Sequence, residues 1–303
     1  MRAMSRPDSL LHPEPLPVER ILFDSPLARI GTFRCRPEHP LFKDSGPIVN
    51  PVFVFPRTAV WIEHDGQKPF LSDPTAATLY NRGQRYRRRP LSESGDRCEW
   101  FALAPGILTE IASGRDRAAI ERPERPFTTP QTSVDRGVYL AQRRLVECLA
   151  HGEPPDRLFV EESVVWLATR ILETAGDRGG LPGTSRPSAR VLRRQADQAV
   201  RTREILAARF DQPSSLEALA SQVGVSAFHL CRLFRRHTGM TLHEYRTELR
   251  LRDALDRLAS RREDLTRIAL DLGFSSHSHF TAAFRRAFGM TPSAFVRHAR
   301  PAV

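Results

Sequence analysis

The clearest pattern of apolar and polar positions lies between residues 214 and 300, where two stretches of sequence repeat each other. In each stretch, apolar residues recur at spacings of three and four, which places them on one face of a short helix. These residues are Leu216, Leu219, Ala220 and Val223 in the first copy and Leu265, Ile268, Ala269 and Leu272 in the second. Gly224 and Gly273 follow, and glycine suits a tight turn.

A second predicted helix follows each turn and has a basic polar side. Ser226 and Ser276 suit its start, because a serine hydroxyl can accept a hydrogen bond from the first helical turn. Two further pairs have capping-box spacing: Ser214 with Glu217, and Thr241 with Glu244. A helix, a glycine turn and a basic helix form the pattern of a helix-turn-helix. Its duplication favours this reading over a plain helical bundle with an accidental repeat.

This part of the chain resembles the DNA-binding domain of the AraC/XylS family of bacterial transcription regulators. Two runs carry the resemblance: SLEALASQVGVSAFHLCRLFRRHTGMTLHEYRTELRL and GFSSHSHFTAAFRRAFGMTPSAF. The resemblance covers about the last third of the chain. It implies two helix-turn-helix units joined by one helix, here about residues 242–259. The side chains expected to turn inward on that helix are Leu242, Tyr245, Leu249 and Leu255.

Before residue 104 the pattern changes to short apolar runs separated by turn residues. Such runs are typical of an antiparallel β-sandwich or barrel. The predicted strands are residues 28–35, 48–55, 58–63, 77–80 and 98–103. The family resemblance implies a cupin-like barrel at this place.

Helical periodicity returns in residues 132–150 and 159–175, which predicts a helical hairpin. The hairpin covers the barrel or forms a dimer interface, and the resemblance favours the dimer interface. Residues 176–188 are rich in Gly, Pro and Ser and are predicted to be a linker. A basic helix is then expected at 189–210.

The fold class expected from these patterns is α+β with two domains. Residues 1–175 are expected to form a cupin-like sensing and dimerisation domain with a helical hairpin, in which the proline-rich residues 1–19 are a flexible arm. Residues 189–303 are expected to form an all-α DNA-binding domain with two helix-turn-helix units.

Charge is unevenly distributed along the chain. Residues 187–303 contain 20 arginines and 11 acidic residues, so they hold most of the formal net charge of +11. A basic domain with a groove-binding fold favours double-stranded DNA as its partner.

Other chemistry finds little support in the sequence. The four cysteines are widely spaced, so neither a zinc site nor a disulfide framework is predicted. His39 and His64 are isolated and are expected on the surface or in turns, so no metal or other cofactor is expected. No nucleophile elbow or phosphate loop suggests an enzyme. Without a long apolar run, the protein is expected to be soluble and cytoplasmic, with no membrane partner.

The run of Arg85, Arg87, Arg88 and Arg89 has two possible roles. Such runs are usually a solvated face of the protein, which is the preferred interpretation. The alternative is a binding site for an acidic effector.

The residues predicted to bind DNA are those left exposed when each second helix packs on its own unit. In the first unit they are Ala227, Phe228, Cys231, Arg232, Arg235 and Arg236, and in the second His277, Ser278, Thr281, Ala282, Arg285 and Arg286. Arg232 is the strongest candidate for reading a base, because a guanidinium can donate two hydrogen bonds to guanine O6 and N7. Phe228 could contact a thymine methyl group. Arg285 and Arg286 are better placed for phosphates.

The predicted function is a sequence-specific transcription regulator of the AraC/XylS type, with activation as the expected mode. An effector or a partner at the N-terminal domain is expected to control it, and a homodimer is the expected assembly. RNA polymerase is a further partner if the protein activates. The alternative is a ligand-independent regulator whose N-terminal domain only dimerises or binds another protein. A cavity in the barrel would favour an effector, whereas a filled interior would favour pure assembly.

Overall fold

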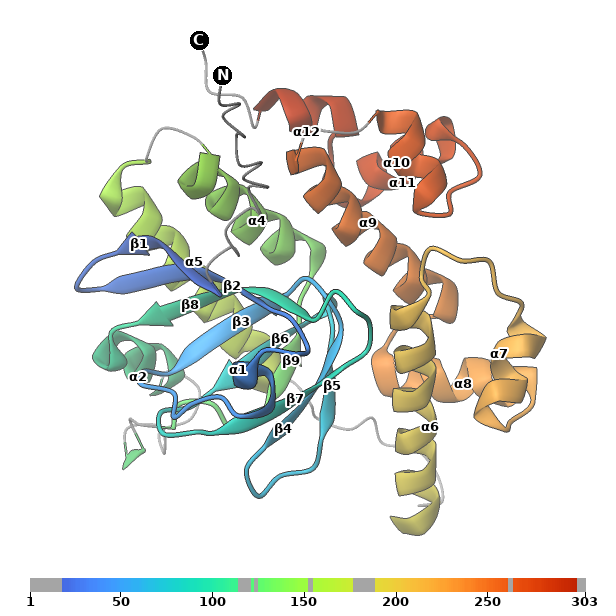
Figure 1. The fold of residues 1–303 in the computed structure, drawn as a ribbon, viewed down its shortest axis with the longest axis horizontal. Coiled ribbons are helices and arrows are strands. Elements are labelled where there is room, and N and C mark those ends of the chain that lie inside the picture. Colours follow the sequence, from blue (N-terminus) through green and yellow to red (C-terminus); the bar gives the residue numbers. More distant parts are fainter. Residues whose placement is uncertain are drawn as a thin grey trace, which may run out of the picture.

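Strands occupy the first part of the chain and helices the last (Figure 1). The computed structural model describes residues 18–113, 121–122, 125–151, 155–176, 189–260 and 264–298. Within these residues the predicted α+β class is confirmed.

The strands form two antiparallel sheets. The larger sheet has the order β1-β2-β8-β3-β6-β9 and the smaller one β5-β4-β7. The strand bounds are β1 Glu19–Asp24, β2 Ala28–Cys35, β3 Val52–Pro56, β4 Val60–His64, β5 Phe70–Ser72, β6 Ala76–Tyr80, β7 Tyr86–Pro90, β8 Asp96–Leu103 and β9 Gln131–Ser133. Two short helices, α1 (Pro40–Lys43) and α2 (Pro105–Ser113), lie among them in the chain.

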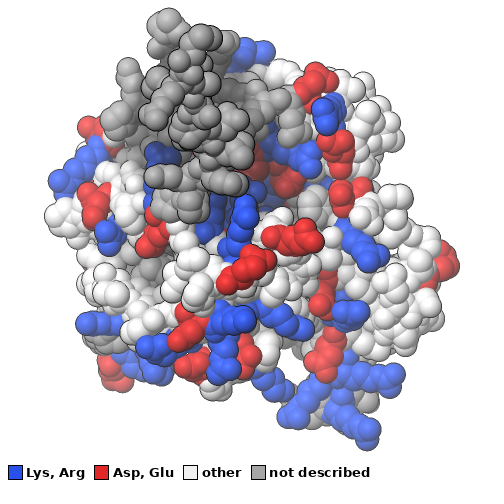
Figure 2. Space-filling view, viewed as in Figure 1, with Lys and Arg blue, Asp and Glu red and all other residues white. Residues whose placement is uncertain are grey.

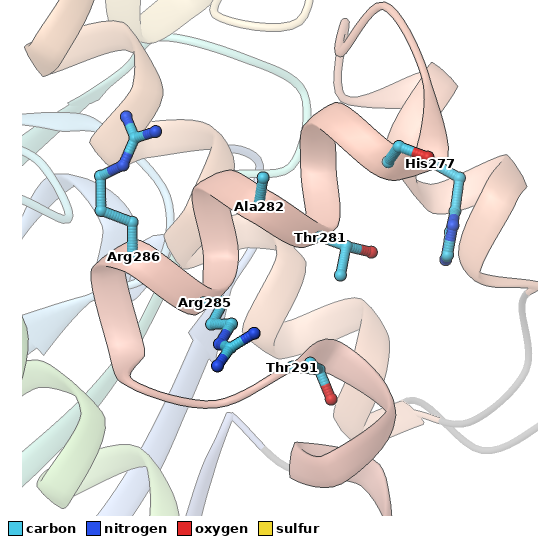
Figure 3. A pocket seen from close by; sticks show the side chains of 7 residues that line it. His277, Thr281, Ala282, Arg285, Arg286 and Thr291 are labelled. Carbon is cyan, nitrogen blue, oxygen red and sulfur yellow. The ribbon is translucent and has the colours of Figure 1, made fainter.

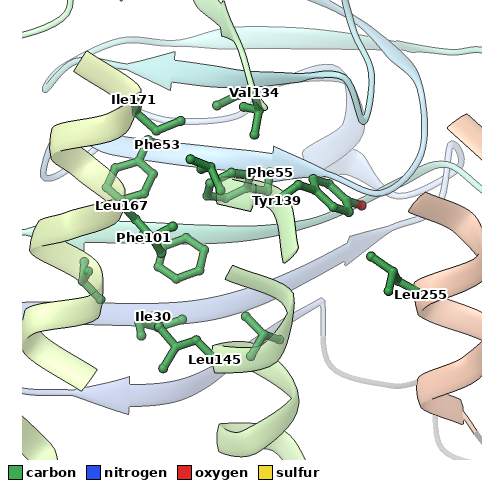
Figure 4. Packing of buried hydrophobic residues seen from close by; sticks show 14 of the residues in the cluster. Ile30, Phe53, Phe55, Phe101, Val134, Tyr139, Leu145, Leu167, Ile171 and Leu255 are labelled. Carbon is green, nitrogen blue, oxygen red and sulfur yellow. The ribbon is translucent and has the colours of Figure 1, made fainter. Parts of the chain in front are cut away.

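Alternation along the strands gives the larger sheet two different faces. On one face Phe101 lies between Ile30 of β2 and Phe53 of β3, and its ring stacks on Phe53 with centroids 5.4 Å apart. The helices α4 (Arg136–His151) and α5 (Arg157–Gly176) cover this face and contribute Leu145 and Leu167 to the same core (Figure 4). The other face turns toward the smaller sheet.

The five strands predicted from sequence are present, and β2 has the predicted bounds. Four strands were missed: β1, β5, β7 and β9. The strands β5 and β9 span three residues each and are too short to show alternation. The strand β7 has the sequence YRRRP, so its charge conceals its pattern.

Most predicted boundaries differ from the observed ones by a few residues, and at two of them a strand occupies residues predicted to be something else. The helix predicted at 132–150 begins only at Arg136, because Gln131–Ser133 pairs with β6 as a strand. Glu19, predicted to lie in a flexible arm, begins β1 and pairs with Phe33. Residues 1–17 of the predicted arm and residues 177–188 of the predicted linker lie outside the described residues.

The C-terminal helices reproduce the sequence repeat. Their bounds are α6 Ala189–Ala208, α7 Leu216–Val223, α8 Ala227–Thr238, α9 Leu242–Ser260, α10 Leu265–Asp271, α11 His277–Phe288 and α12 Pro292–His298. Figure 1 shows α9 running from the unit that contains α7 and α8 to the unit that contains α10 and α11. The connecting helix is therefore confirmed, one residue longer than predicted.

Side-chain caps fix where these helices begin. Ser226 and Ser276 are N-caps, as predicted, and accept hydrogen bonds from His229 N (3.3 Å) and His279 N (3.1 Å). Thr241 and Glu244 form the predicted capping box: Glu244 N donates to Thr241 Oγ1 (3.1 Å), and Thr241 N donates to Glu244 Oε2 (2.7 Å). The prediction for Ser214 was wrong, since the N-cap of α7 is the next residue.

Candidate nucleic-acid interface and barrel cavity

The helix α8 has a buried face and an exposed face, as its sequence predicted. Leu230, Leu233 and Phe234 are buried in the core of the first unit. On the opposite side Phe228, Cys231, Arg232, Arg235 and Arg236 are exposed, and Ala227 is half-buried. The exposed residues leave a mixed aromatic and basic surface for a partner.

Phe228 and Arg232 form a pair on this surface. Phe228 is 73% exposed, which is unusual for so large an apolar side chain. The guanidinium carbon of Arg232 lies 5.5 Å from the centre of its ring, within the range of a cation–π contact. The aromatic ring thereby limits the directions that the arginine can take.

The second unit presents a shallow open pocket along α11 (Figure 3). All six residues predicted from α11 line it: His277, Ser278, Thr281, Ala282, Arg285 and Arg286. Thr291 also lines the pocket and was not predicted. Its hydroxyl accepts a hydrogen bond from Ala294 N (3.1 Å) in α12. The available signal was the sequence repeat, in which Thr291 corresponds to Thr241.

Arg285 and Arg286 point in different directions. In Figure 3 the side chain of Arg285 extends toward Thr291, whereas that of Arg286 extends away from it. Both side chains are exposed and lie in the last turn of α11, where a cation also stabilises the helix dipole. One surface therefore presents two separate cationic contacts.

The helix α9 contributes to both cores. Tyr245 and Leu249 belong to the core of the first unit, whereas Leu251 and Leu255 belong to the larger cluster that contains the phenylalanines of the second unit together with the core of the N-terminal domain. The prediction that Tyr245, Leu249 and Leu255 turn inward is confirmed, and Leu242 is half-buried. A continuous helix shared by two cores keeps the two units in a fixed relation.

Arg250 of α9 also links the two units, and no sequence pattern singled it out. Its Nε donates to Phe210 O (2.7 Å), which follows α6, and its Nη1 donates to Gly273 O (2.8 Å) in the turn of the second unit. Burial and neighbouring Arg246 lower the pKa of Arg250 to about 10. Gly273 has φ +76°, and a Cβ there would lie 2.3 Å from Asp211 O, so this turn requires glycine.

Basic side chains also gather where α6 begins. Arg190, Arg193 and Arg194 are exposed there, and Figure 2 shows Lys and Arg concentrated at this end of the molecule. Farther along α6 the arginines have acidic partners: Arg201 Nη1 lies 2.7 Å from Glu204 Oε2, and Arg203 pairs with Asp73. The excess positive charge thus lies near the first unit.

A cavity of about 400 Å³ lies between the two sheets. Its wall includes apolar residues from both: Phe33, Val52, Val54, Trp100 and Ala102 of the larger sheet and Val60 and Ile62 of the smaller. The barrel interior is therefore not filled by its own side chains. This volume lies within the usual range of small-molecule sites.

The structure corrects two expectations about the barrel. Arg85, Arg87 and Arg89 are exposed, but Arg88 is buried and lines the cavity. Every second side chain of a strand points to the same face, so Arg88 of β7 faces inward together with Tyr86.

His64 is 1% exposed and was wrongly expected at the surface. It packs among aromatic rings, with the Phe70 ring centroid 5.2 Å away and that of Tyr80 5.0 Å away. Burial lowers its pKa below the ordinary value. His39, by contrast, caps α1 by accepting a hydrogen bond from Leu41 N (3.2 Å).

Two absences are limited to the described residues. Among them, no group of three or more His, Cys, Asp or Glu side chains is placed to hold a metal ion. None of the helices in the described ranges is long and apolar enough to cross a bilayer.

Comparison with known proteins identifies the helical units. A family model described as a helix-turn-helix domain matches residues 219–298. The regulatory protein SoxS of Salmonella typhimurium is 40% identical over 88 residues, which are 29% of this chain and 81% of SoxS. The chain belongs to the AraC/XylS family. It is a DNA-binding transcription regulator.

The C-terminal part of the chain is also similar to other regulators. The transcriptional activator RhaS of Escherichia fergusonii is 37% identical over 83 residues, which are 27% of this chain and 30% of RhaS. The chain thus spans less than a third of that relative. A regulator structure from Chromobacterium violaceum, with an AraC-type DNA-binding domain, is 31% identical and covers 36% of this chain and 96% of its own, with a TM-score of 0.32.

Proposed function

We propose that this AraC/XylS regulator binds a specific DNA sequence by placing α8 and α11 in successive major grooves on one face of the duplex. The observation that carries the proposal is the duplicated unit braced by α9, with an exposed helix face in each copy. Simultaneous binding requires the two helices to lie about one helical turn apart, roughly 34 Å. The residues proposed to contact DNA are the twelve predicted from sequence.

The two helices are proposed to contribute differently. The helix α8 offers Arg232, whose forked donors can read guanine, and Phe228, which can contact a thymine methyl group. The helix α11 offers the short side chains of Ser278, Thr281 and Ala282, with arginines at its end. We infer that α8 supplies more of the sequence discrimination and that α11 mainly positions the protein on phosphates.

Replacing Arg232 by Ala tests this division. Loss of a bidentate contact should cost about 1–3 kcal/mol at one base position and relax the preference there. Arg286→Ala is the matched control: it should weaken binding to all sequences alike and reduce the salt slope by about 1. Binding-site selection with the purified protein supplies the operator, and fluorescence anisotropy against single-base variants supplies the affinities. Equal losses on every sequence for Arg232→Ala would contradict its base-reading role.

The N-terminal residues 1–175 are proposed to be a cupin-like domain that controls the DNA-binding residues 189–303, with residues 176–188 as linker. The support for an effector is the unfilled cavity between the sheets. Activation is proposed because RhaS is named an activator, and an activator would use RNA polymerase as a further partner.

One path from the cavity to the DNA-binding units runs through β5. Ser72 lines the cavity, and the next residue, Asp73, is 0% exposed. The carboxylate of Asp73 pairs with Arg203 of α6 and accepts a hydrogen bond from the Tyr245 hydroxyl of α9 (2.7 Å). Movement of the cavity wall at Ser72 would therefore act directly on the first helix-turn-helix unit.

A second path follows β3. Pro56 lines the cavity, and the next residue, Arg57, lies 2.5 Å from the Asp256 carboxylate of α9. Arg57 is 4% exposed at its side chain, so this ion pair is shielded from water. Both sets of contacts reach α9, the helix that holds the two units in a fixed relation. A ligand that moves the cavity wall is therefore proposed to change DNA binding by shifting α9.

Dimerisation is proposed through α5. Three large apolar side chains on this helix are exposed: Leu158 (62%), Phe159 (55%) and Trp166 (45%). Residues 158 and 166 are eight apart and 159 and 166 are seven apart, so all three lie near one helix face. A self-complementary apolar face of this kind suits a two-fold dimer, and it is also the feature that favours the ligand-independent alternative.

Trp166→Asp should dissociate the proposed dimer. A buried tryptophan at an interface contributes roughly 2 kcal/mol or more, and the two-fold interface contains two copies. Sedimentation equilibrium measures the change in dissociation constant. Leu270→Asp on α10 is the control, because Leu270 is also an exposed apolar residue (55%) but lies outside the proposed interface. Equal effects of the two substitutions would count against α5.

A further inference from the structure

The charged groups inside the barrel cavity neutralise one another. Arg88 and Asp96 both line it, and Arg88 Nε lies 2.5 Å from Asp96 Oδ2. Their side chains are 3% and 7% exposed, so the pair is buried. The cavity therefore contains one positive and one negative charge in direct contact, and its inner end has no net charge.

Three more N–H groups of Arg88 are also engaged. Its Nη1 donates to Leu41 O (2.8 Å) and to Ser45 Oγ (2.6 Å), and its Nη2 donates to the Tyr86 hydroxyl (2.7 Å). With the bond to Asp96, four of the five N–H groups of the guanidinium are used. The guanidinium carbon also lies 4.5 Å from the ring centre of Phe33. One N–H group of Nη2 has no partner among the described residues, so an incoming carboxylate could form a two-pronged contact with Arg88 only by displacing one of these partners.

The rest of the wall offers little polar chemistry. Ser72 Oγ is already hydrogen-bonded to Thr78 Oγ1 (2.7 Å). Glu19 and Arg29, which also line the cavity, are exposed to solvent and opposite in charge. Between these ends the wall is mostly aliphatic and aromatic. Its polar groups include Asn50, which is exposed, and Nε1 of Trp100, which is buried and has no hydrogen-bond partner among the described residues.

The ionisable side chains in the cavity wall also show that burial disfavours a negative charge there. Burial raises the pKa of Asp96 above its ordinary value, even though Arg88 acts in the opposite direction. Burial also raises the pKa of Cys98 and Tyr80, and it raises that of Tyr86 to about 12. For a negatively charged group at this place, the loss of hydration free energy is larger than the gain from its attraction to Arg88.

We propose that the barrel cavity binds a neutral, largely apolar small molecule and discriminates against its carboxylate analogue. The inference rests on the proposed effector control and names the chemical class of the effector. It argues against an acidic effector inside the cavity, because the one arginine of the run that lines the cavity is held by Asp96.

Matched acid and amide pairs test the proposal. Isothermal titration of the full-length protein would compare 1-naphthamide with 1-naphthoate and octanamide with octanoate. Within each pair the shape is nearly constant and the charge changes. We expect at least one amide to bind at least tenfold more tightly than its acid. Ala102→Phe, which fills the cavity, should abolish that binding and so locate it.

Asp96→Asn should shift the preference toward the acid. The substitution removes the negative partner of Arg88 and leaves an uncompensated cation in the cavity, so the acid should gain at least tenfold relative to the amide. Asp44→Asn is the matched control: Asp44 pairs with Arg85 at 3.2 Å but is 74% exposed, and its loss should leave the ratio unchanged. If the Asp96 variant does not fold, the ratio of acid affinity to amide affinity in the natural protein still tests the neutral-ligand proposal.

The possible results separate the inference from the proposed function. Tighter binding of the acids to the natural protein would overturn the neutral-ligand inference and leave effector control standing. Failure of every acid and amide to bind would overturn both, while DNA recognition would still stand on its own binding-site selection.

Discussion

Asp73→Ala is expected to lower the free energy of unfolding by about 3–5 kcal/mol, because it leaves a buried cation without its partner. Asp73 is 0% exposed, pairs with Arg203 and accepts hydrogen bonds from Thr75 N (2.8 Å) and the Tyr245 hydroxyl (2.7 Å). Chemical denaturation monitored by circular dichroism measures the loss. Hydrogen exchange should also become faster in α6 and α9, which Asp73 holds against the barrel.

An exposed ion pair provides the control for Asp73. Asp24 lies 3.3 Å from Arg29, but its side chain is 61% exposed, so Asp24→Ala should cost no more than about 1 kcal/mol. Comparable losses for the two substitutions would show that the contact between β5 and the helical units contributes little.

The Asp73 contact also has a pH signature. Burial alone would raise the pKa of this carboxyl, but Arg203 and the hydrogen bonds from Thr75 and Tyr245 outweigh burial and lower it below its ordinary value. A carboxyl with a lower pKa in the folded state contributes stability that is present above its unfolded pKa, about 4, and is lost as the pH falls through the folded value. Asp73→Asn should therefore flatten the acid side of the stability profile.

Phe284→Ala is expected to destabilise the second helix-turn-helix unit by about 3–5 kcal/mol, the usual cost of truncating a buried phenylalanine. Phe284 is 0% exposed, and its ring centre lies 4.7 Å from that of Phe288 and 6.1 Å from that of Phe295. These rings join α11 to α12, so their loss should also misplace the DNA-binding face of α11. The midpoint temperature of thermal unfolding and the affinity for the operator should both fall.

Phe228→Ala is the matched control, since it makes the same chemical change on the corresponding helix of the first unit. Phe228 is 73% exposed, so its removal should change stability by no more than about 0.5 kcal/mol while reducing operator affinity. A large loss of stability in this variant would mean that Phe228 packs on protein and is not presented to DNA.

Local sequence signals made the helices of residues 189–303 predictable. The caps at Ser226, Ser276 and Thr241 and the apolar stripes of each helix act within a few residues, so periodicity alone located them. The duplication then ordered these helices into two units. At Ser214 the predicted cap was one position too early, because the adjacent Ser215 is the N-cap of α7.

The barrel was harder to predict because its strands take their identity from partners far away in sequence. The strand β7 is a run of arginines that becomes a strand only through pairing with β4, and its middle arginine is buried only because Asp96 arrives from β8. His64 became a core residue through the rings of Phe70 and Tyr80. None of these partners has a fixed spacing that a sequence pattern could show.

The sequence by itself determined the pair of helix-turn-helix units, the helix between them and the faces proposed for DNA, because helix periodicity and capping are local. Only the tertiary structure decided that a cavity remains between the sheets, that its charges cancel, and that Asp73 and Arg57 tie its wall to α6 and α9. Those features depend on side chains brought together across the whole chain, and a buried ion pair is defined only when both partners and the loss of water are known.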